Sequence, residues 1–267
     1  MSTPLPPLTR AKQAHLKNLF KERRARQADG TFVVEGAKAV RDILRGSGNL
    51  VRTIVTTPEY RAKESSQDRS LRVSLSAESC SCPEPTFSRL SEVEEAQGIL
   101  AIVQQPVWDE RAVFAEPTLF GIFCERIQDP LNIGTIVRTA AGLGASALWL
   151  TSDSADLFSP KVVRGTAGAL LSLPTFQAET VDDFLRNGCA IVAADASNEG
   201  TIRIGAIESV PRRLILAVGN EGRGLSERTK QAAVCRFRIP LSREVESLNV
   251  AVTTAIALHV LGGLPKR

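Results

Sequence analysis

Short blocks of apolar residues alternate with polar, turn-forming stretches along the first 105 residues. In the segment 10–26, Leu16, Leu19 and Phe20 recur at helical spacing while lysines and arginines occupy the other faces, which predicts a basic amphipathic helix. Apolar runs typical of strands lie at 31–36, 51–57 and 99–105, and helical patterns lie at 37–46 and 88–98. The polar stretch 61–86, rich in Ser, Cys and Pro, is expected to be a surface excursion. The alternation predicts a small α/β domain over residues 1–105.

From residue 118 onward the predicted strands are apolar without interruption, as in LILAV at 214–218 and AIVAA at 190–194. Strands of that kind are typical of a parallel sheet that is covered on both faces. Helical patterns alternate with them, including those at 132–144 and 247–261. Residues 118–267 are therefore expected to form an open α/β domain. The segment 106–117, bounded by prolines, is expected to be an interdomain linker.

Composition narrows the class of protein. A chain of 267 residues that is 43% hydrophobic can bury one medium core and one small one. The chain has no uncharged apolar run of about 18 residues and no apolar secretory signal at its start, so a cytoplasmic protein without a membrane span is expected. The five cysteines include no CxxC pair, which argues against a disulfide framework and against a zinc site. Cys80 and Cys82 are expected to be loop residues without a chemical role.

The net charge of +4 is unevenly distributed along the chain. Residues 1–45 contain ten Lys or Arg against four Asp or Glu. A basic region on a near-neutral body indicates a polyanionic partner, although a solvated helix face accounts for the charge equally well.

Three segments carry more polar or glycine residues than an ordinary connection between a strand and a helix needs. In the first, 127–141, a strand ends, Pro130 stiffens the turn and a helix begins near Asn132. Asn132 and Arg138 are six residues apart and cannot stack on one helical face. They converge on one pocket if Asn132 lies in the loop and Arg138 on the helix. The alternative is a helix-capping asparagine with a surface arginine.

The second segment, 214–226, runs from a buried strand into a loop that contains Gly219, Gly222 and Gly224. Glycines permit positive φ angles and the close approach of a ligand to the backbone. The GxxGxG spacing matches neither the GxGxxG dinucleotide fingerprint nor a phosphate-binding P-loop. In the third segment, 239–252, a charged loop leads into an apolar helix for which Ser247 is the predicted N-cap. Capping by Ser247 would not explain why an asparagine stands at position 249.

Together these segments resemble the SpoU (TrmH-like) family of RNA ribose methyltransferases, part of the SPOUT class. The resemblance covers about residues 118–262 and is carried by NIGTIVRTAAGLGA, VVRGTAGALLSLP, GNEGRGLS and IPLSREVESLNVAVTTAIAL. Residues 8–105, with KNLFKERRARQADGTFVVEG, resemble more loosely the small ribosomal-protein-like RNA-binding domain that many members carry in front.

The resemblance implies a parallel sheet whose carboxyl-terminal segment passes through a loop to form a deep trefoil knot, and a homodimer through the knotted domain. It also implies S-adenosyl-L-methionine as the cofactor, held largely by backbone groups, and no metal. By motif position, the implied cofactor-binding residues are Gly219, Ile239 and Leu248, with Leu216, Leu241 and Asn249 nearby.

The implied reaction is transfer of a methyl group to a ribose 2′-hydroxyl, with Arg138 as the central catalytic residue and Asn132, Glu221, Ser247 and Asn249 completing the site. A guanidinium has a pKa above about 12 and is a poor base. Arg138 is therefore expected to hold the adjacent phosphate and to stabilise the developing alkoxide. Glu221 and Ser247 both remain candidates for relaying the proton.

Folded RNA is recognised through its shape, phosphates and 2′-hydroxyls. The residues expected to contact it are Lys17, Lys21, Arg23, Arg24 and Arg26. By analogy, the separate amino-terminal domain favours 23S-type ribosomal RNA over transfer RNA. The alternatives are a tRNA 2′-O-methyltransferase, a base methyltransferase, which the SLN triplet disfavours, and a non-catalytic RNA-binding protein on the same fold. A hydrolase is disfavoured because the chain lacks GxSxG and has only two histidines, His15 and His259.

Overall fold

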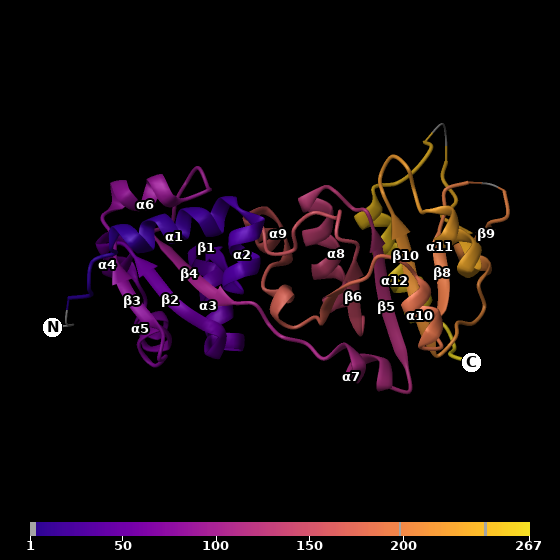
Figure 1. Ribbon diagram of the computed structural model, residues 1–267, viewed down its shortest axis with the longest axis horizontal. Coiled ribbons are helices and arrows are strands. Elements are labelled where there is room, and N and C mark those ends of the chain that lie inside the picture. The colour runs from indigo at the N-terminus through magenta and orange to yellow at the C-terminus, as the bar shows by residue number, and fades with distance from the viewer. Residues whose placement is uncertain (1–3, 198, 243–244) are drawn as a thin grey trace. The chain divides into compact units, whose positions relative to one another are not determined.

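The computed structural model describes residues 4–197, 199–242 and 245–267, and the chain divides into two compact units (Figure 1). The first unit comprises Met1–Val107 and Asp156–Leu171, and the second comprises Trp108–Ala155 and Ser172–Arg267. This division differs from the predicted one in two places. The segment Asp156–Leu171 packs with the amino-terminal unit, and most of the predicted linker belongs to the second unit.

A four-stranded sheet in the order β1-β4-β2-β3 forms the centre of the first unit. Its strands are β1 (Thr31–Glu35), β2 (Val51–Thr56), β3 (Glu78–Ser81) and β4 (Ile99–Gln104). β4 pairs antiparallel with both β1 and β2, and β3 runs parallel to β2. The strands predicted from the three apolar runs are confirmed, because β1, β2 and β4 lie at those positions. β1 and most of β2 and β4 are buried, as the apolar runs indicated.

The helices of the first unit correct several details of the sequence interpretation. They are α1 (Arg10–Lys21), α2 (Arg23–Asp29), α3 (Ala37–Ser47), α4 (Pro58–Lys63), α5 (Ser66–Val73), α6 (Glu84–Leu90) and α9 (Pro160–Thr166), with 3-10 turns at Gly48–Leu50 and Ala169–Leu171. The single helix predicted over 10–26 is wrong, because Glu22 is extended (φ −113°, ψ 117°) and separates α1 from α2. The helix predicted over 88–98 is also wrong, because α6 ends at Leu90.

The stretch 61–86 is not a surface excursion, since it contains α5 and β3. Cys80 and Cys82 are buried in the core with Leu16, Leu19 and Phe87. Burial raises the pKa of both thiols. Both cysteines therefore pack as small apolar side chains.

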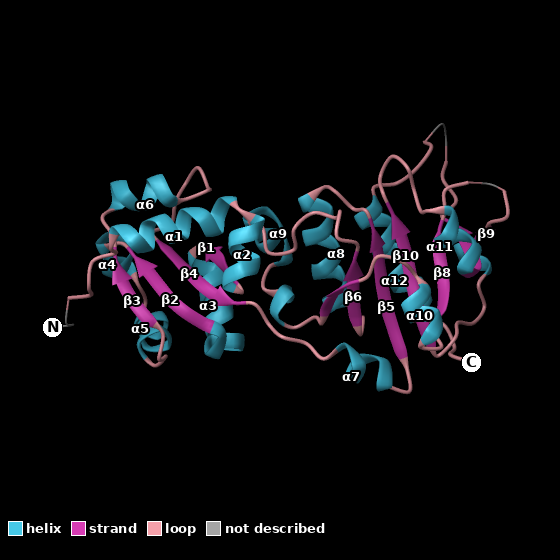
Figure 2. Ribbon diagram, viewed as in Figure 1, coloured by secondary structure: helices cyan, strands magenta, loops and turns pink. Residues whose placement is uncertain are grey.

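The second unit is built on a seven-stranded sheet in the order β7-β6-β5-β10-β8-β11-β9, drawn as magenta arrows in Figure 2. Its strands are β5 (Leu119–Glu125), β6 (Ala147–Leu150), β7 (Thr175–Gln177), β8 (Ala190–Ala194), β9 (Ile202–Arg203), β10 (Arg213–Gly219) and β11 (Ala233–Arg238). Every neighbouring pair in this sheet is parallel. The prediction of a parallel sheet with continuous apolar strands is therefore confirmed.

Helices cover both faces of this sheet. They are α7 (Glu110–Ala115), α8 (Pro130–Gly142), α10 (Asp182–Arg186), α11 (Glu227–Ala232) and α12 (Val250–Gly262), with a 3-10 turn at Ile204–Ala206. α12 packs against α8 and β10. On the other face, Trp149 of β6 contacts Phe114 of α7 and Phe184 of α10, with ring centroids 5.4 and 5.1 Å apart. Residues 108–117 thus contribute to a core, whereas the sequence predicted a linker. Within the described residues, no helix is long and apolar enough to cross a membrane.

Candidate active site

A cavity of about 480 Å³ lies where β8, β10 and β11 end. Phe237, Ile239 and Leu248 give it an apolar lining, and Asp195 and Arg203 add charge. In open parallel sheets, ligands bind at the carboxyl ends of the strands, and sites for small molecules measure about 300–1,000 Å³. The cavity therefore has the place and the size of a site for a small molecule with both apolar and charged parts.

Of the six predicted cofactor residues, four line the cavity, while Leu216 and Asn249 are not among the described residues that line it. Gly219, Ile239, Leu241 and Leu248 all line the cavity, as does Ser247. Leu216 is fully buried in the middle of β10 and is not among the described residues that line it. The position of Leu216 indicates that it packs within the strand that leads to Gly219. It does not indicate a direct contact with a ligand in this cavity.

The loop after β10 is too tightly folded for a side chain at Gly219. A Cβ atom at this position would lie 2.5 Å from the backbone C of Gly224 and 2.5 Å from the N of Leu225. Asn220 Oδ1 accepts hydrogen bonds from the backbone N–H groups of Gly222 and Arg223, at 3.0 and 2.9 Å. Backbone groups of Gly219 and Gly224 consequently form part of the cavity wall.

Three polar side chains from distant segments meet in one hydrogen-bonded chain. Asn249 Nδ2 donates to Asn132 Oδ1 at 2.9 Å, and Asn132 Nδ2 donates to Glu221 Oε1 at 2.8 Å. Asn132 is buried, with 6% of its surface exposed. The structure thus brings together three of the five predicted catalytic residues.

The helix starts differ from those predicted. Asp129 caps α8 by accepting from the N–H of Leu131, so Asn132 lies inside the helix and not in the preceding loop. Asn249 caps α12, because its Oδ1 accepts from the N–H groups of Ala251 and Val252 at 2.8 and 3.3 Å. The prediction of Ser247 as the cap is therefore wrong, and Ser247 lies exposed at the cavity.

Arg138 is exposed on α8, six residues beyond Asn132. Among the described residues, none forms a hydrogen bond or ion pair with Arg138, and it does not line the cavity. Arg138 is therefore presented to solvent and not held within the asparagine network.

Sequence reasoning missed the charged residues that line the cavity: Asp195, Arg203, Arg238 and Glu246. Asp195 is held by an ion pair, since Arg236 Nη1 approaches its Oδ2 to 3.2 Å. Asp195 directly follows β8, and a polar residue just beyond a buried parallel strand was the signal that could have found it.

The predicted RNA-binding cations lie in the first unit, where Lys17, Lys21 and Arg24 are exposed and Arg23 is half-buried. Arg26 requires a correction, because only 4% of its surface is exposed. Its Nε and Nη2 donate to Asp156 Oδ2 at 2.8 and 2.5 Å, and its Nη1 donates to Phe20 O at 3.1 Å. Arg26 is occupied inside the unit and is not available to RNA.

Comparison with known families matches both units. Residues 120–259 match the SpoU rRNA methylase family, and residues 14–101 match an MRM3-like substrate-binding domain. The chain is 28% identical over 246 residues to the 23S rRNA (guanosine(2553)-2'-O)-methyltransferase RlmP of Bacillus subtilis, with 90% of this chain and 92% of that protein covered. It is 38% identical over 143 residues to an uncharacterized tRNA/rRNA methyltransferase of Synechocystis, a match that spans about half of each protein (52% and 51%).

Solved structures give the same picture over nearly the whole chain. The AdoMet-bound rRNA methyltransferase from Sinorhizobium meliloti superposes with a TM-score of 0.81 and 27% identity, covering 97% of this chain and 96% of that one. The SpoU methyltransferase AviRb from Streptomyces viridochromogenes, in complex with AdoMet, gives a TM-score of 0.83 at 25% identity, with 94% and 97% covered. The fold of this chain is thus shared with these proteins over nearly its whole length.

Proposed function

The chain belongs to the SpoU rRNA methylase family, and on that premise we propose that it transfers the methyl group of S-adenosyl-L-methionine to a ribose 2′-hydroxyl of structured ribosomal RNA. The observation that carries the proposal is the hydrogen-bonded chain Asn249–Asn132–Glu221 beside a cavity walled by glycine backbone.

The cavity fits the proposed cofactor in its chemistry. Phe237, Ile239 and Leu248 offer an apolar surface for an adenine ring. Arg203 and Glu246 offer charges of opposite sign, as an amino acid with its carboxylate and ammonium requires. The backbone of Gly219, where no Cβ can be accommodated, allows close approach. Gly219, Ile239, Leu241 and Leu248 would hold the cofactor, which supplies an already activated methyl group.

The protein has two tasks in such a transfer: to align the hydroxyl for in-line attack and to help it lose its proton. Asn132 and Asn249 hold the Glu221 carboxylate in place through directed hydrogen bonds. Glu221 and Ser247 are the two candidates for accepting the proton. Arg138, exposed and without an ion pair to any residue that the structure describes, is the cation that we assign to the RNA phosphate and to the developing alkoxide.

The proposal includes a deep trefoil knot, a homodimer and a cytoplasmic location. The packing of α12 against both α8 and β10 supports a knotted carboxyl-terminal segment. Leu131 and Val252, in the first turns of α8 and α12, are 64% and 47% exposed although both are apolar, which supports a subunit interface in this unit. Light scattering after gel filtration tests the dimer.

The test of the function has two arms. Calorimetric titration with S-adenosyl-L-methionine should give saturable binding, and incubation with unmodified ribosomal RNA and tritiated cofactor should label RNA in ribose 2′-O-methyl nucleosides. Nucleoside mass spectrometry then identifies the modified residue. Labelling of transfer RNA alone would move the substrate to tRNA, and RNA binding without cofactor binding would reduce the protein to a non-catalytic binder.

A further inference from the structure

The end of β5 carries a buried carboxylate to which neither the sequence motifs nor the proposed reaction assigns a task. Glu125 is the last residue of β5 and pairs in register with Gly219 of β10. Only 6% of its surface is exposed. A buried carboxylate is costly unless its oxygens are hydrogen-bonded, so its partners indicate what it does.

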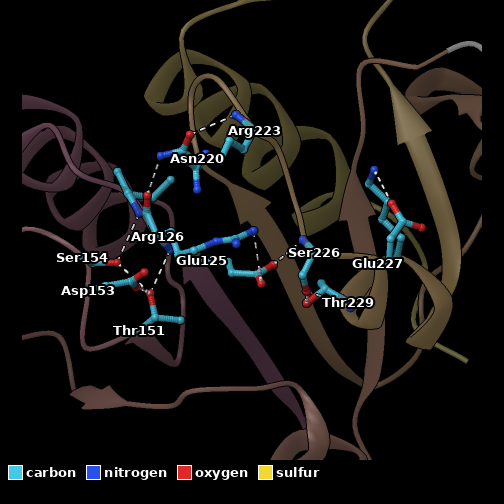
Figure 3. Close-up of polar contacts among 12 residues, drawn as sticks. Glu125, Arg126, Thr151, Asp153, Ser154, Asn220, Arg223, Ser226, Glu227 and Thr229 are labelled. Carbon is cyan, nitrogen blue, oxygen red and sulfur yellow. Dashed lines mark hydrogen bonds and ion pairs between the residues drawn. The ribbon is translucent and has the colours of Figure 1, made fainter.

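Glu125 has two partners, one of which is a backbone N–H at the end of the loop that bears Glu221. Glu125 Oε2 accepts from the backbone N–H of Ser226 at 3.0 Å, and its Oε1 lies 3.7 Å from Nη2 of Arg126. Figure 3 shows the Arg126 side chain pointing back toward this carboxylate. The guanidinium thus supplies a positive charge beside the buried acid.

The residue after Glu125 holds the other end of the same loop. Arg126 O accepts from Nδ2 of Asn220 at 2.9 Å (Figure 3). Arg126 itself has a positive φ of 60°, which ends the extended backbone of the strand, and its N–H donates to Thr151 Oγ1 at 2.8 Å. Glu125, the last residue of β5, and Arg126, which follows it, therefore hold the last and the first residue of the loop 220–226, respectively.

Between these two fastenings lies the functional part of the loop. Glu221 directly follows Asn220, and Gly224, which lines the cavity, precedes Ser226 by two residues. The N–H of Gly224 also donates to Asn220 O at 2.9 Å. A shift at Ser226 would therefore reach both the cavity wall and the Glu221 carboxylate.

We propose that Glu125 is a positioning residue, whose buried carboxylate fixes the loop 220–226 through the N–H of Ser226 and thereby sets the placement of Glu221 and of the cavity wall. Its effect on methyl transfer rests on the proposed function, whereas its effect on the loop does not. Glu125 does not line the cavity among the described residues, so it acts through the loop and not on the reactants.

The test separates the Glu125 contact from general destabilisation. Glu125→Gln removes the charge. The glutamine amide has only one oxygen, so it can accept from only one of the two donors, Ser226 N–H and Arg126. The matched control is Glu35→Gln, because Glu35 is also a buried strand-end carboxylate (8% exposed) that accepts from a backbone N–H, that of Glu92, but lies in the first unit. Both variants should lose similar stability in thermal melts.

Hydrogen exchange provides a readout that needs no cofactor. Glu125→Gln should accelerate exchange of the amides of residues 222–226, and Glu35→Gln should leave them as in the parent. The dissociation constant for S-adenosyl-L-methionine should rise roughly tenfold in Glu125→Gln alone, the size expected when one hydrogen bond to a charged group is lost.

Substitutions at Ser226 identify the contact. Ser226 has φ −65°, which proline accepts, so Ser226→Pro removes the N–H, while Ser226→Ala removes only the hydroxyl cap of α11. If Glu125 acts through that N–H, Glu125→Gln weakens cofactor binding in the Ser226→Ala background and has little further effect in the Ser226→Pro background. Parent-like loop exchange in Glu125→Gln would overturn the positioning role. Accelerated exchange in a protein that binds no S-adenosyl-L-methionine would keep that role and refute the proposed function.

Discussion

Asn249 donates a hydrogen bond to Asn132 across 117 positions of the chain, at 2.9 Å. The direction of this bond is set by the helix that Asn249 caps. Its Oδ1 accepts from the N–H groups at the start of α12, so its Nδ2 is the atom left to face Asn132. Asn132 must then present Oδ1 to Asn249 and Nδ2 to Glu221. A helix cap thus orients the whole chain of amides that ends on the Glu221 carboxylate.

Asn249→Asp should separate capping from this relay. The aspartate keeps an acceptor at the α12 N-terminus, where negative charge is favourable, so the melting temperature should stay near that of the parent. It cannot donate to Asn132, and methyl transfer should fall at least about tenfold, as expected for one lost hydrogen bond to a polar group in a site. Single-turnover assays and thermal melts check this. Asn249→Ala is the control that should lose both properties, with about 1 kcal/mol of stability.

Gly219→Ala should abolish cofactor binding while Gly222→Ala does not. The added Cβ at Gly219 would meet the backbone of Gly224 and Leu225 at 2.5 Å, so the loop must move. At Gly222 the nearest atom would be Asn220 Oδ1 at 3.7 Å, an ordinary contact. Calorimetric titration with S-adenosyl-L-methionine measures the difference. Equal affinities for the two variants would show that the loop after β10 is not a wall of the cofactor site.

The polarity pattern predicted β1, β2, β4, β8 and β10 because continuous burial leaves a direct trace in the sequence, and it missed β3, in which only Cys80 is buried. It did not predict that α1 and α2 are separate, since the break at Glu22 is a local backbone change inside an otherwise helical pattern. Nor did it place α7 in a core: the Trp149–Phe114 contact joins residues far apart in the chain.

The resemblance to a family named the candidate site residues, but it did not predict how their side chains are arranged. Asn132, Glu221 and Asn249 were named as separate motif positions, yet the chain of hydrogen bonds depends on how α8, α12 and β10 pack. Arg26 was misjudged for the opposite reason. A basic sequence does not reveal which cation is buried, and its partner Asp156 lies 130 positions away.

Arg138→Ala should eliminate methyl transfer and leave cofactor affinity within about twofold of the parent, because Arg138 is exposed and does not line the cavity. A tritiated-methyl assay beside a calorimetric titration tests both halves. Arg111→Ala, another exposed arginine of the second unit, is the control for a simple loss of surface charge. Undiminished turnover of Arg138→Ala would remove it from the catalytic machinery.

Neutralising Lys17, Lys21 and Arg24 together should weaken RNA binding and lower the slope of log affinity against log salt by up to about 2–3, since each lost phosphate contact contributes about 0.7–0.9. All three side chains are exposed on α1 and α2. Filter binding over a range of salt concentrations measures the slope. An unchanged slope would mean that this surface faces away from RNA.

Arg26→Met should act on stability and not on that slope. The substitution leaves Asp156, whose side chain is 14% exposed, without its cationic partner, and breaking a buried pair from one side costs about 3–5 kcal/mol. Arg26→Met combined with Asp156→Asn should recover part of the loss, because the unpaired charge is then absent. Urea denaturation of the parent, Arg26→Met and the double variant should rank their stabilities as parent, then double variant, then Arg26→Met. The slope of RNA binding against salt is then measured for each protein at a temperature where it is folded. If Arg26→Met is as stable as the parent but has a reduced salt slope, Arg26 contacts RNA. That result would contradict the buried position in which Arg26 bonds to Asp156 and Phe20.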